Sequence, residues 1–190
     1  MNSAFFSLIF RQKYIKRWGL MRNINEENLS SHSFEVAVLA HALAVIGNTY
    51  FGKNYDAERI CTIALFHDAE EVYTGDMPTP IKYFNPEMRE NYRLVEQAAS
   101  ASLLSKLPDE LKPVYSELLN NDEGDIHKII KAADKLAAYI KCIEEEKCGN
   151  AEFAKASKAT KKSLEEMNCE ELSYFMKNML PSFLLTIDEI

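Results

Sequence analysis

The most constraining feature of the sequence is an apolar run that ends in a histidine and an aspartate. Residues 60–66 contain one hydroxyl and no charge, and His67 and Asp68 follow directly. The run comes shortly after Asp56, a good helix N-cap, so we predict a helix that is buried on nearly every face. Aspartate is almost never fully buried unless something pairs with it. Because an imidazole stands beside it, a metal ion is the natural partner, and the run predicts a metal site inside a helical core.

The rest of the chain also favours helices. No sustained period-2 alternation occurs, and glycine is scarce, at 6 of 190 residues. Ser30 or Ser31 is predicted to cap the second helix and Gly47 to close it, while Asp125 caps a long helix that Gly149 ends. We therefore predict an all-α fold, a bundle of seven or eight helices. The predicted helices span residues 4–16, 31–47, 57–72, 86–106, 109–120, 125–147, 151–166 and 169–178.

Composition limits the organisation and the partners. A chain of 190 residues predicts one domain, 1–190. The net charge of −7 argues against binding a nucleic-acid polymer, but allows small anionic substrates. Four cysteines without a C-x-x-C pair predict a reduced, cytoplasmic protein. No stretch approaches the roughly 18 apolar residues of a membrane span, so we expect no membrane partner. The apolar residues before Arg11 are expected to form an amphipathic helix rather than a signal peptide.

Asp134 is a second candidate ligand, on the predicted long helix. Its neighbours Ile130 and Ala137 place it on or beside the apolar stripe of that helix. The alternative is a boundary aspartate paired with Lys131 or Lys135, and spacing alone does not decide between the two.

His32 is a candidate in the first turn of the apolar second helix. A lone histidine on such a helix is more often a packed, hydrogen-bonded residue than a ligand. His41 follows nine residues later, about 180° around the helix, so the two histidines cannot share a face. We find no role for His41 or for His127.

Together these residues resemble the HD-domain metal-dependent phosphohydrolases, with the match at His32, His67, Asp68 and Asp134. More specific stretches are similar to the bacterial HD-domain 5′-deoxynucleotidases, and the likeness covers essentially the whole chain. These stretches are residues 17–23, 28–33, 67–72, 74–84, 131–142 and 181–183. One departure is Ser31, where that family usually has an acidic residue before the histidine. That position is not a metal ligand in the family, so the departure bears only on the support of His32.

The resemblance implies hydrolysis of deoxyribonucleoside 5′-monophosphates to deoxynucleoside and phosphate. It also implies one divalent metal ion, cobalt or manganese, and a homodimer. His32, His67, Asp68 and Asp134 would be the metal ligands. Asp68 and Asp134 would in addition contact the substrate and orient the attacking water.

Further residues receive roles from their chemistry and from the resemblance. Glu71 follows His67 by four residues and would transfer a proton or position water, unless it is a solvated helix-end residue. Arg17 has the planar guanidinium that binds oxyanions bidentately, and would hold the phosphate, unless it is solvated. Trp18, the sole tryptophan, is by default a packing aromatic. In the family it lies near the sugar, where its bulk would exclude a 2′-hydroxyl.

The segment from 74 to 80 contains Gly75, Pro78 and Pro80 and is predicted as a rigid loop. In this loop Thr79 could donate a hydroxyl to the substrate. Asp76 could accept from the sugar 3′-hydroxyl or protonate the leaving oxygen. The alternative is that both are ordinary turn residues.

Two other functions compete. The first is an HD-domain hydrolase of dNTPs, guanosine polyphosphates or cyclic dinucleotides. Such enzymes with two metals need further histidines, and a triphosphate site needs more cations than Arg17 and Arg22. The second is a non-catalytic metal- or nucleotide-binding helical protein, against which the intact set of candidate ligands argues.

Overall fold

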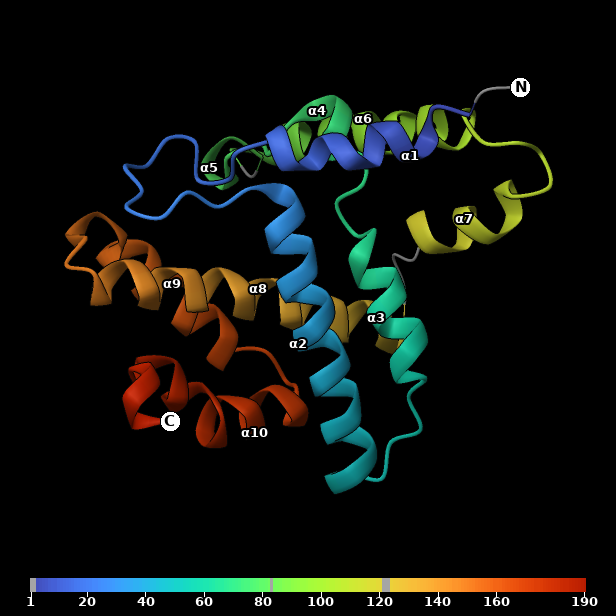
Figure 1. Cartoon of the computed structure of the whole chain (residues 1–190). Coiled ribbons are helices and arrows are strands. Elements are labelled where there is room, and N and C mark those ends of the chain that lie inside the picture. Colours follow the sequence, from blue (N-terminus) through green and yellow to red (C-terminus); the bar gives the residue numbers. More distant parts are fainter. Residues whose placement is uncertain (1–2, 83, 121–123) are drawn as a thin grey trace. The chain divides into compact units, whose positions relative to one another are not determined.

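The fold is all-α, as predicted. The computed structural model describes residues 3–82, 84–120 and 124–190, and in these ranges the chain forms ten α-helices and four short 3-10 helices (Figure 1). In place of a sheet, the described residues contain one isolated antiparallel bridge, between Lys16 and Asn28. Residue 83 of the stretch 74–84 lies outside the described residues. The single-domain organisation stays a prediction.

The chain divides into two compact units. Unit 1 holds the described residues of 1–22, 26–33 and 66–121, and unit 2 those of 23–25, 34–65 and 122–190. Helix α2 (Leu29–Tyr50) contributes its first turn to unit 1 and the remainder to unit 2.

Unit 1 is built around a small aromatic and aliphatic core. Phe5, Leu103 and Leu107 are buried at its centre, and Phe66 packs against them. The ring of Phe66 meets Tyr115 edge to face, with 5.8 Å between centroids. Phe66 directly precedes the His67-Asp68 pair, so this packing anchors the pair. The other elements of unit 1 are α1 (Phe5–Ile9), η1 (Phe10–Tyr14), α4 (Glu71–Thr74), α5 (Thr79–Lys82), α6 (Pro86–Leu104) and α7 (Lys112–Leu119).

Unit 2 contains a buried ion pair on its longest helix, α8 (Gly124–Lys147). Lys141 Nζ lies 2.5 Å from Glu145 Oε1, and both side chains are almost fully buried. The Glu145 carboxylate also accepts from the backbone N–H groups of Ile24 and Asn25, each at 3.0 Å, and from Asn150 Nδ2 at 2.7 Å. The remaining elements of unit 2 are α3 (Ala57–Leu65), η2 (Ala151–Phe153), α9 (Ala154–Glu165), α10 (Glu170–Asn178), η3 (Leu180–Leu184) and η4 (Ile187–Glu189).

The predicted helix 57–72 is wrong over residues 66–70, whereas residues 71 and 72 are helical again, in α4. Asp56 caps it as expected, with its Oδ1 accepting from Arg59 N–H at 2.9 Å, but α3 ends at Leu65. Between Phe66 and Tyr73 several backbone hydrogen bonds join residues three apart, for example Ala69 N–H to the Phe66 carbonyl at 3.0 Å. Bonds of this spacing tighten the chain into successive turns. His67 and Asp68 therefore lie on a turn that is held by buried apolar neighbours, and not within a helix.

Two further boundaries differ from the prediction. Helix α2 begins at Leu29, because the Asn28 side chain accepts from the Ser31 backbone N–H at 3.0 Å, so neither Ser30 nor Ser31 is the cap. Gly47 does not close the helix. A Cβ at this position would lie 2.7 Å from the Tyr55 ring, so glycine here allows a close approach of two segments.

Other predicted boundaries had mixed outcomes. Gly149 follows the end of α8 with φ +85°, the left-handed conformation expected of a terminating glycine. Helix α8 begins at Gly124, so Asp125 lies in its first turn and pairs with Lys128 at 3.1 Å. The segment predicted as a loop from 74 to 80 contains the first residues of α5.

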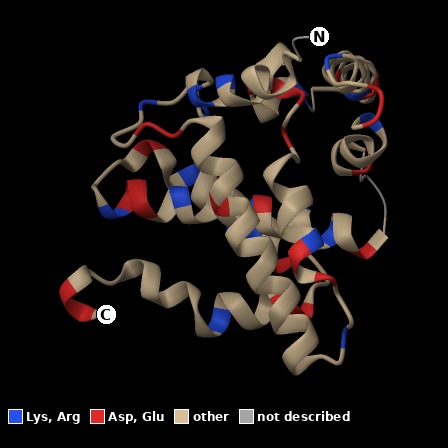
Figure 2. Cartoon of the chain, turned by 45° about the vertical axis from the view of Figure 1, so that its right-hand side comes forward, with Lys and Arg blue, Asp and Glu red and all other residues tan. Residues whose placement is uncertain are grey.

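The expectation that no stretch approaches the length of a membrane span was wrong for α2. Among the described residues, this helix is long and apolar enough to cross a membrane, judged by length and composition alone. However, 56% of its most apolar window is buried inside the protein, and a core helix has the same properties. The absence of a membrane partner stays a prediction. In Figure 2 the Lys and Arg residues are interspersed with Asp and Glu along the described chain. The absence of a nucleic-acid polymer partner stays a prediction.

Candidate active site

Three predicted ligands form one compact donor group in unit 1. One ligand atom each from His32, His67 and Asp68 lies within 4.8 Å of the others, and no second group of this kind occurs among the described residues. Asp68 Oδ2 lies 3.0 Å from His67 Nε2 and 3.9 Å from His32 Nε2. Two donors that are each about 2.0–2.2 Å from one metal ion lie about 3–4 Å apart. The spacing and the mixed nitrogen and oxygen donors therefore fit a divalent cation.

Asp68 is charged in this environment. Burial alone would raise its pKa, but His67, His32 and Arg17 outweigh burial and hold the pKa well below its usual range. A carboxylate must be deprotonated to bind a metal, so the site presents the required form.

Glu27, which the sequence analysis missed, supports the fully buried His32. Its Oε1 lies 3.1 Å from His32 Nδ1, which leaves Nε2 on the side of Asp68. Burial opposes ionisation of Glu27, but the neighbouring His32, the charge of Arg17 and the hydrogen bond from Trp18 outweigh burial and lower its pKa. A carboxylate on the second ring nitrogen fixes the orientation and tautomer of a metal-binding histidine. Ser31 is exposed and does not provide this support.

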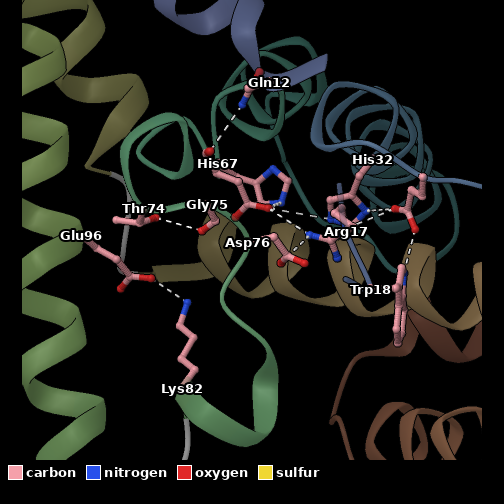
Figure 3. Close-up of polar contacts among 12 residues, drawn as sticks. Gln12, Arg17, Trp18, His32, His67, Thr74, Gly75, Asp76, Lys82 and Glu96 are labelled. Carbon is pink, nitrogen blue, oxygen red and sulfur yellow. Dashed lines mark hydrogen bonds and ion pairs between the residues drawn. The ribbon is translucent and has the colours of Figure 1, made fainter. Parts of the chain in front are cut away.

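Arg17 lies among three carboxylates. Its Nε is 3.2 Å from Glu27, and its Nη1 is 3.6 Å from Asp68 Oδ2 and 3.7 Å from Asp76 Oδ1. Figure 3 shows Arg17 between Asp76 and His32. The two Nη1 distances exceed those of a hydrogen bond, so the Nη1 contacts with Asp68 and Asp76 are ion pairs. The guanidinium therefore lies beside the Asp68 carboxylate, where it would meet an oxyanion bound at the donor group.

Trp18 has an unusual backbone for a bulky residue. Its φ is +56°, and no other non-glycine residue in the described chain has a positive φ. Such a conformation costs about 1–3 kcal/mol and persists only where the surroundings impose it. The indole Nε1–H donates to Glu27 Oε2 at 2.8 Å, so the side chain is also fixed (Figure 3).

Glu71 begins α4 and is only 6% exposed, so the solvated alternative does not hold. Its Oε2 is buried and has no hydrogen-bond partner among the described residues. Burial, together with the nearby charges of Asp68 and Asp76, raises the pKa of Glu71 to about 10. The group is thus a protonated acid near neutral pH in the protein alone.

Of the remaining predicted residues, Asp76 lies beside the donor group, whereas Thr79 lies on α5 and Asp134 on α8. Asp76 follows Gly75, whose φ of +71° turns the chain. Burial raises the pKa of Asp76, and the charge of Arg17 lowers it less strongly. Thr79 is the exposed first residue of α5. Asp134 is partly buried on α8 in unit 2, whereas the donor group lies in unit 1, so a fourth ligand stays a prediction. The structure brings together the predicted residues Arg17, Trp18, His32, His67, Asp68, Glu71 and Asp76, joined by Glu27.

Comparison with known proteins identifies the family. A family model described as 5′-deoxynucleotidase YfbR-like matches residues 4–183. The chain belongs to this family. A curated relative from Vibrio cholerae, named 5′-deoxynucleotidase, is 49% identical over 191 aligned positions, which cover 100% of this chain and 98% of the relative. A second relative, 5′-deoxynucleotidase YfbR of Salmonella paratyphi B, is 46% identical and 96% of its length is covered.

The fold is that of the HD-domain phosphohydrolases. The crystal structure of an HD-domain phosphohydrolase from Listeria innocua matches with a TM-score of 0.82 at 24% identity, covering 96% of this chain and 89% of the other. The predicted HD-domain fold is thereby confirmed.

Proposed function

We propose that this protein is a metal-dependent 5′-deoxynucleotidase, which hydrolyses deoxyribonucleoside 5′-monophosphates to deoxynucleoside and phosphate. The observation that carries the proposal is a metal-fitting donor group with a guanidinium 3.6 Å from its carboxylate. The family match over residues 4–183, and relatives that bear the name 5′-deoxynucleotidase, support the choice of substrate.

The proposed metal ligands are His32, His67, Asp68 and Asp134. When bound, a divalent cation polarises a phosphoryl oxygen and acidifies water. Asp68 and Asp134 would also orient the attacking water. Arg17 would hold the phosphate, because its planar fork matches two oxyanion oxygens and its present partners already place it beside Asp68.

Two acids are proposed to handle protons. Attack of water on phosphorus breaks the bond to the 5′-oxygen, so one proton leaves the water and another must reach the leaving oxygen. Glu71 would position the water or exchange a proton with it at Oε2, the buried atom without a hydrogen-bond partner in the described chain. Asp76, whose pKa is raised, would protonate the leaving oxygen or accept a hydrogen bond from the 3′-hydroxyl.

Discrimination between deoxyribose and ribose is assigned to Trp18. A rigid side chain can exclude a larger ligand only if it cannot move aside. The indole hydrogen bond to Glu27 holds Trp18, and its φ of +56° indicates that the surroundings impose this conformation. Thr79 would add a hydroxyl donor to the bound nucleotide.

Some finer properties are proposed from the family resemblance alone. They are cobalt or manganese as the native metal and a homodimer as the assembly. The cytoplasmic location rests on cysteine usage, and the single domain on the length of the chain.

The decisive experiment measures phosphate release by metal-stripped protein reconstituted separately with Co²⁺, Mn²⁺, Mg²⁺ and Zn²⁺. The substrates are the deoxyribonucleoside and ribonucleoside 5′-monophosphates. The dNTPs and cyclic dinucleotides, which are the substrates of the alternative HD-domain activity, are tested separately. We expect turnover of the deoxyribonucleoside monophosphates only. Cleavage of dNTPs or cyclic dinucleotides is followed by chromatography of the nucleotide products, because opening a phosphodiester, or freeing triphosphate from a dNTP, releases no inorganic phosphate. Cleavage of these compounds alone would support the other HD-domain activity, and binding without any turnover would support a non-catalytic protein.

A further inference from the structure

We propose that Glu27 is a positioning residue that aligns metal binding, phosphate binding and sugar selection through one carboxylate. The inference rests on the proposed function for the roles of the three residues that Glu27 contacts. It concerns a residue outside the predicted ligand and substrate sets, and it assigns Glu27 no contact with the substrate.

The contacts use both oxygens of the side chain. Oε1 lies 3.1 Å from His32 Nδ1 and 3.2 Å from Arg17 Nε, while Oε2 accepts from Trp18 Nε1 at 2.8 Å. Glu27 is only 8% exposed, so water does not compete strongly for these donors. A buried charge with three donors is held in one geometry, and it holds the donors in turn.

The backbone brings Glu27 to this position. At the bridge between Lys16 and Asn28, the Arg17 N–H donates to the Glu27 carbonyl at 3.0 Å, and the Leu29 N–H donates to the Ile15 carbonyl at 2.9 Å. The bridge therefore sets Arg17 directly beside Glu27. Helix α2 then begins at Leu29 and places His32 in its first turn, within reach of the same carboxylate.

The conformation of Trp18 points to the same conclusion. A tryptophan with φ +56° is strained, and its indole hydrogen bond to Glu27 is one of the contacts that offset this strain. Loss of the carboxylate should free the indole to leave its position. A neutral amide cannot replace the carboxylate, because its NH₂ group would face at least one of the three donors.

The test compares Glu27→Gln with Glu26→Gln. The control residue is adjacent and carries the same charge. Its side chain is 69% exposed and pairs with the exposed Lys16. Metal affinity is measured by Co²⁺ titration of the stripped proteins, and Trp18, the sole tryptophan, reports its own environment by fluorescence without metal or substrate. For Glu27→Gln we expect Co²⁺ affinity about 10–100-fold weaker and Trp18 emission shifted to longer wavelength. Glu26→Gln should match the wild type in both.

A third readout separates positioning from metal loss. At saturating Co²⁺ the kcat/KM ratio for dAMP over AMP should fall several-fold in Glu27→Gln and stay unchanged in Glu26→Gln. Circular dichroism verifies that each variant is folded. If Glu27→Gln does not fold, Glu27→Asp takes its place: it keeps the charge, but its shorter side chain cannot reach all three donors, so the same directions of change are expected.

The inference is overturned if the folded Glu27 variant binds Co²⁺ within about twofold of the control affinity and its Trp18 emission maximum lies within a few nanometres of that of the control. A wild-type protein that hydrolyses no monophosphate would refute the proposed function. Because the Co²⁺ titration and the fluorescence need no turnover, they would still decide whether Glu27 positions its three neighbours.

Discussion

Replacing Glu145 by glutamine tests how much a buried charge contributes to the fold of unit 2. Each oxygen of this carboxylate accepts from two donors: Oε1 from Lys141 and the Asn25 backbone, and Oε2 from Asn150 and the Ile24 backbone. Either placement of a glutamine amide therefore sets its NH₂ group against two donors. The variant also leaves the ammonium of Lys141 buried without its counter-charge.

The magnitude follows from the pKa of Glu145. Burial would raise it, but the hydrogen bonds from Lys141, the Ile24 backbone, Asn150 and the Asn25 backbone outweigh burial and lower the pKa from 4.5 to about 2. Since one pKa unit corresponds to about 1.4 kcal/mol, the charged form stabilises the folded state by roughly 3 kcal/mol over the neutral form. We expect Glu145→Gln to lower the free energy of unfolding at pH 7 by about this amount.

The stabilisation by Glu145 is expected to decrease as the pH falls. A carboxylate with a lowered folded-state pKa contributes its full stability above the unfolded value of 4.5 and loses it as the pH falls toward about 2. Urea unfolding of the wild type and the variant should therefore differ by roughly 3 kcal/mol at pH 7, and by progressively less below pH 4.5. Glu146→Gln, an exposed change on the same helix, is the control. A Glu145→Gln penalty equal to that of the control, or one that persists undiminished at pH 3, would refute the reasoning.

Three functional predictions concern the active site. Asp68→Ala should abolish turnover and also the stabilisation of the fold by Co²⁺. For the wild type this stabilisation is about 2.7 kcal/mol at a Co²⁺ concentration one hundred times Kd, and thermal unfolding with and without Co²⁺ measures it. A variant that stays active would place the site elsewhere. Trp18→Ala should lower the kcat/KM preference for dAMP over AMP by about 10–100-fold, and an unchanged preference would mean that another residue selects the sugar. Arg17→Lys keeps the charge but loses the planar fork, so KM for dAMP should rise about tenfold or more while Co²⁺ affinity stays constant; parallel losses of both would contradict a role confined to phosphate.

The sequence was sufficient to predict the helical class and most of the candidate site, because those signals are local. An uncharged run before His67 and Asp68, and a histidine one helix earlier, can be recognised without knowing the fold. The exact conformation at the pair could not be predicted. Apolar residues at close spacing suit both a continuing helix and a series of tight turns, and the packing of Phe66 in the core of unit 1 decides between them.

Glu27 could not be recognised for a different reason. Its neighbours Trp18 and Arg17 lie nine and ten residues earlier, and only the bridge between Lys16 and Asn28 brings them together. Helical periodicity carries no information about such a pairing. Gly47 was misread in the same way, since the need for a small residue arises from the Tyr55 ring across the turn and not from the helix itself.

The bridge between Lys16 and Asn28 also sets which parts of this region tolerate a change of chain length. Gly19 is exposed, and apart from its chain neighbours no atom of the described residues lies within 4 Å of where a Cβ would be. An added residue there would therefore enlarge a loop whose two ends stay joined. Between Asn28 and His32 the chain is already helical, and one inserted residue would rotate the histidine by about 100° around the axis of α2. His32 would then leave both Glu27 and Asp68. Within fourteen residues, the chain thus joins a segment of adjustable length to one whose length is fixed by the contacts of His32 with Glu27 and Asp68.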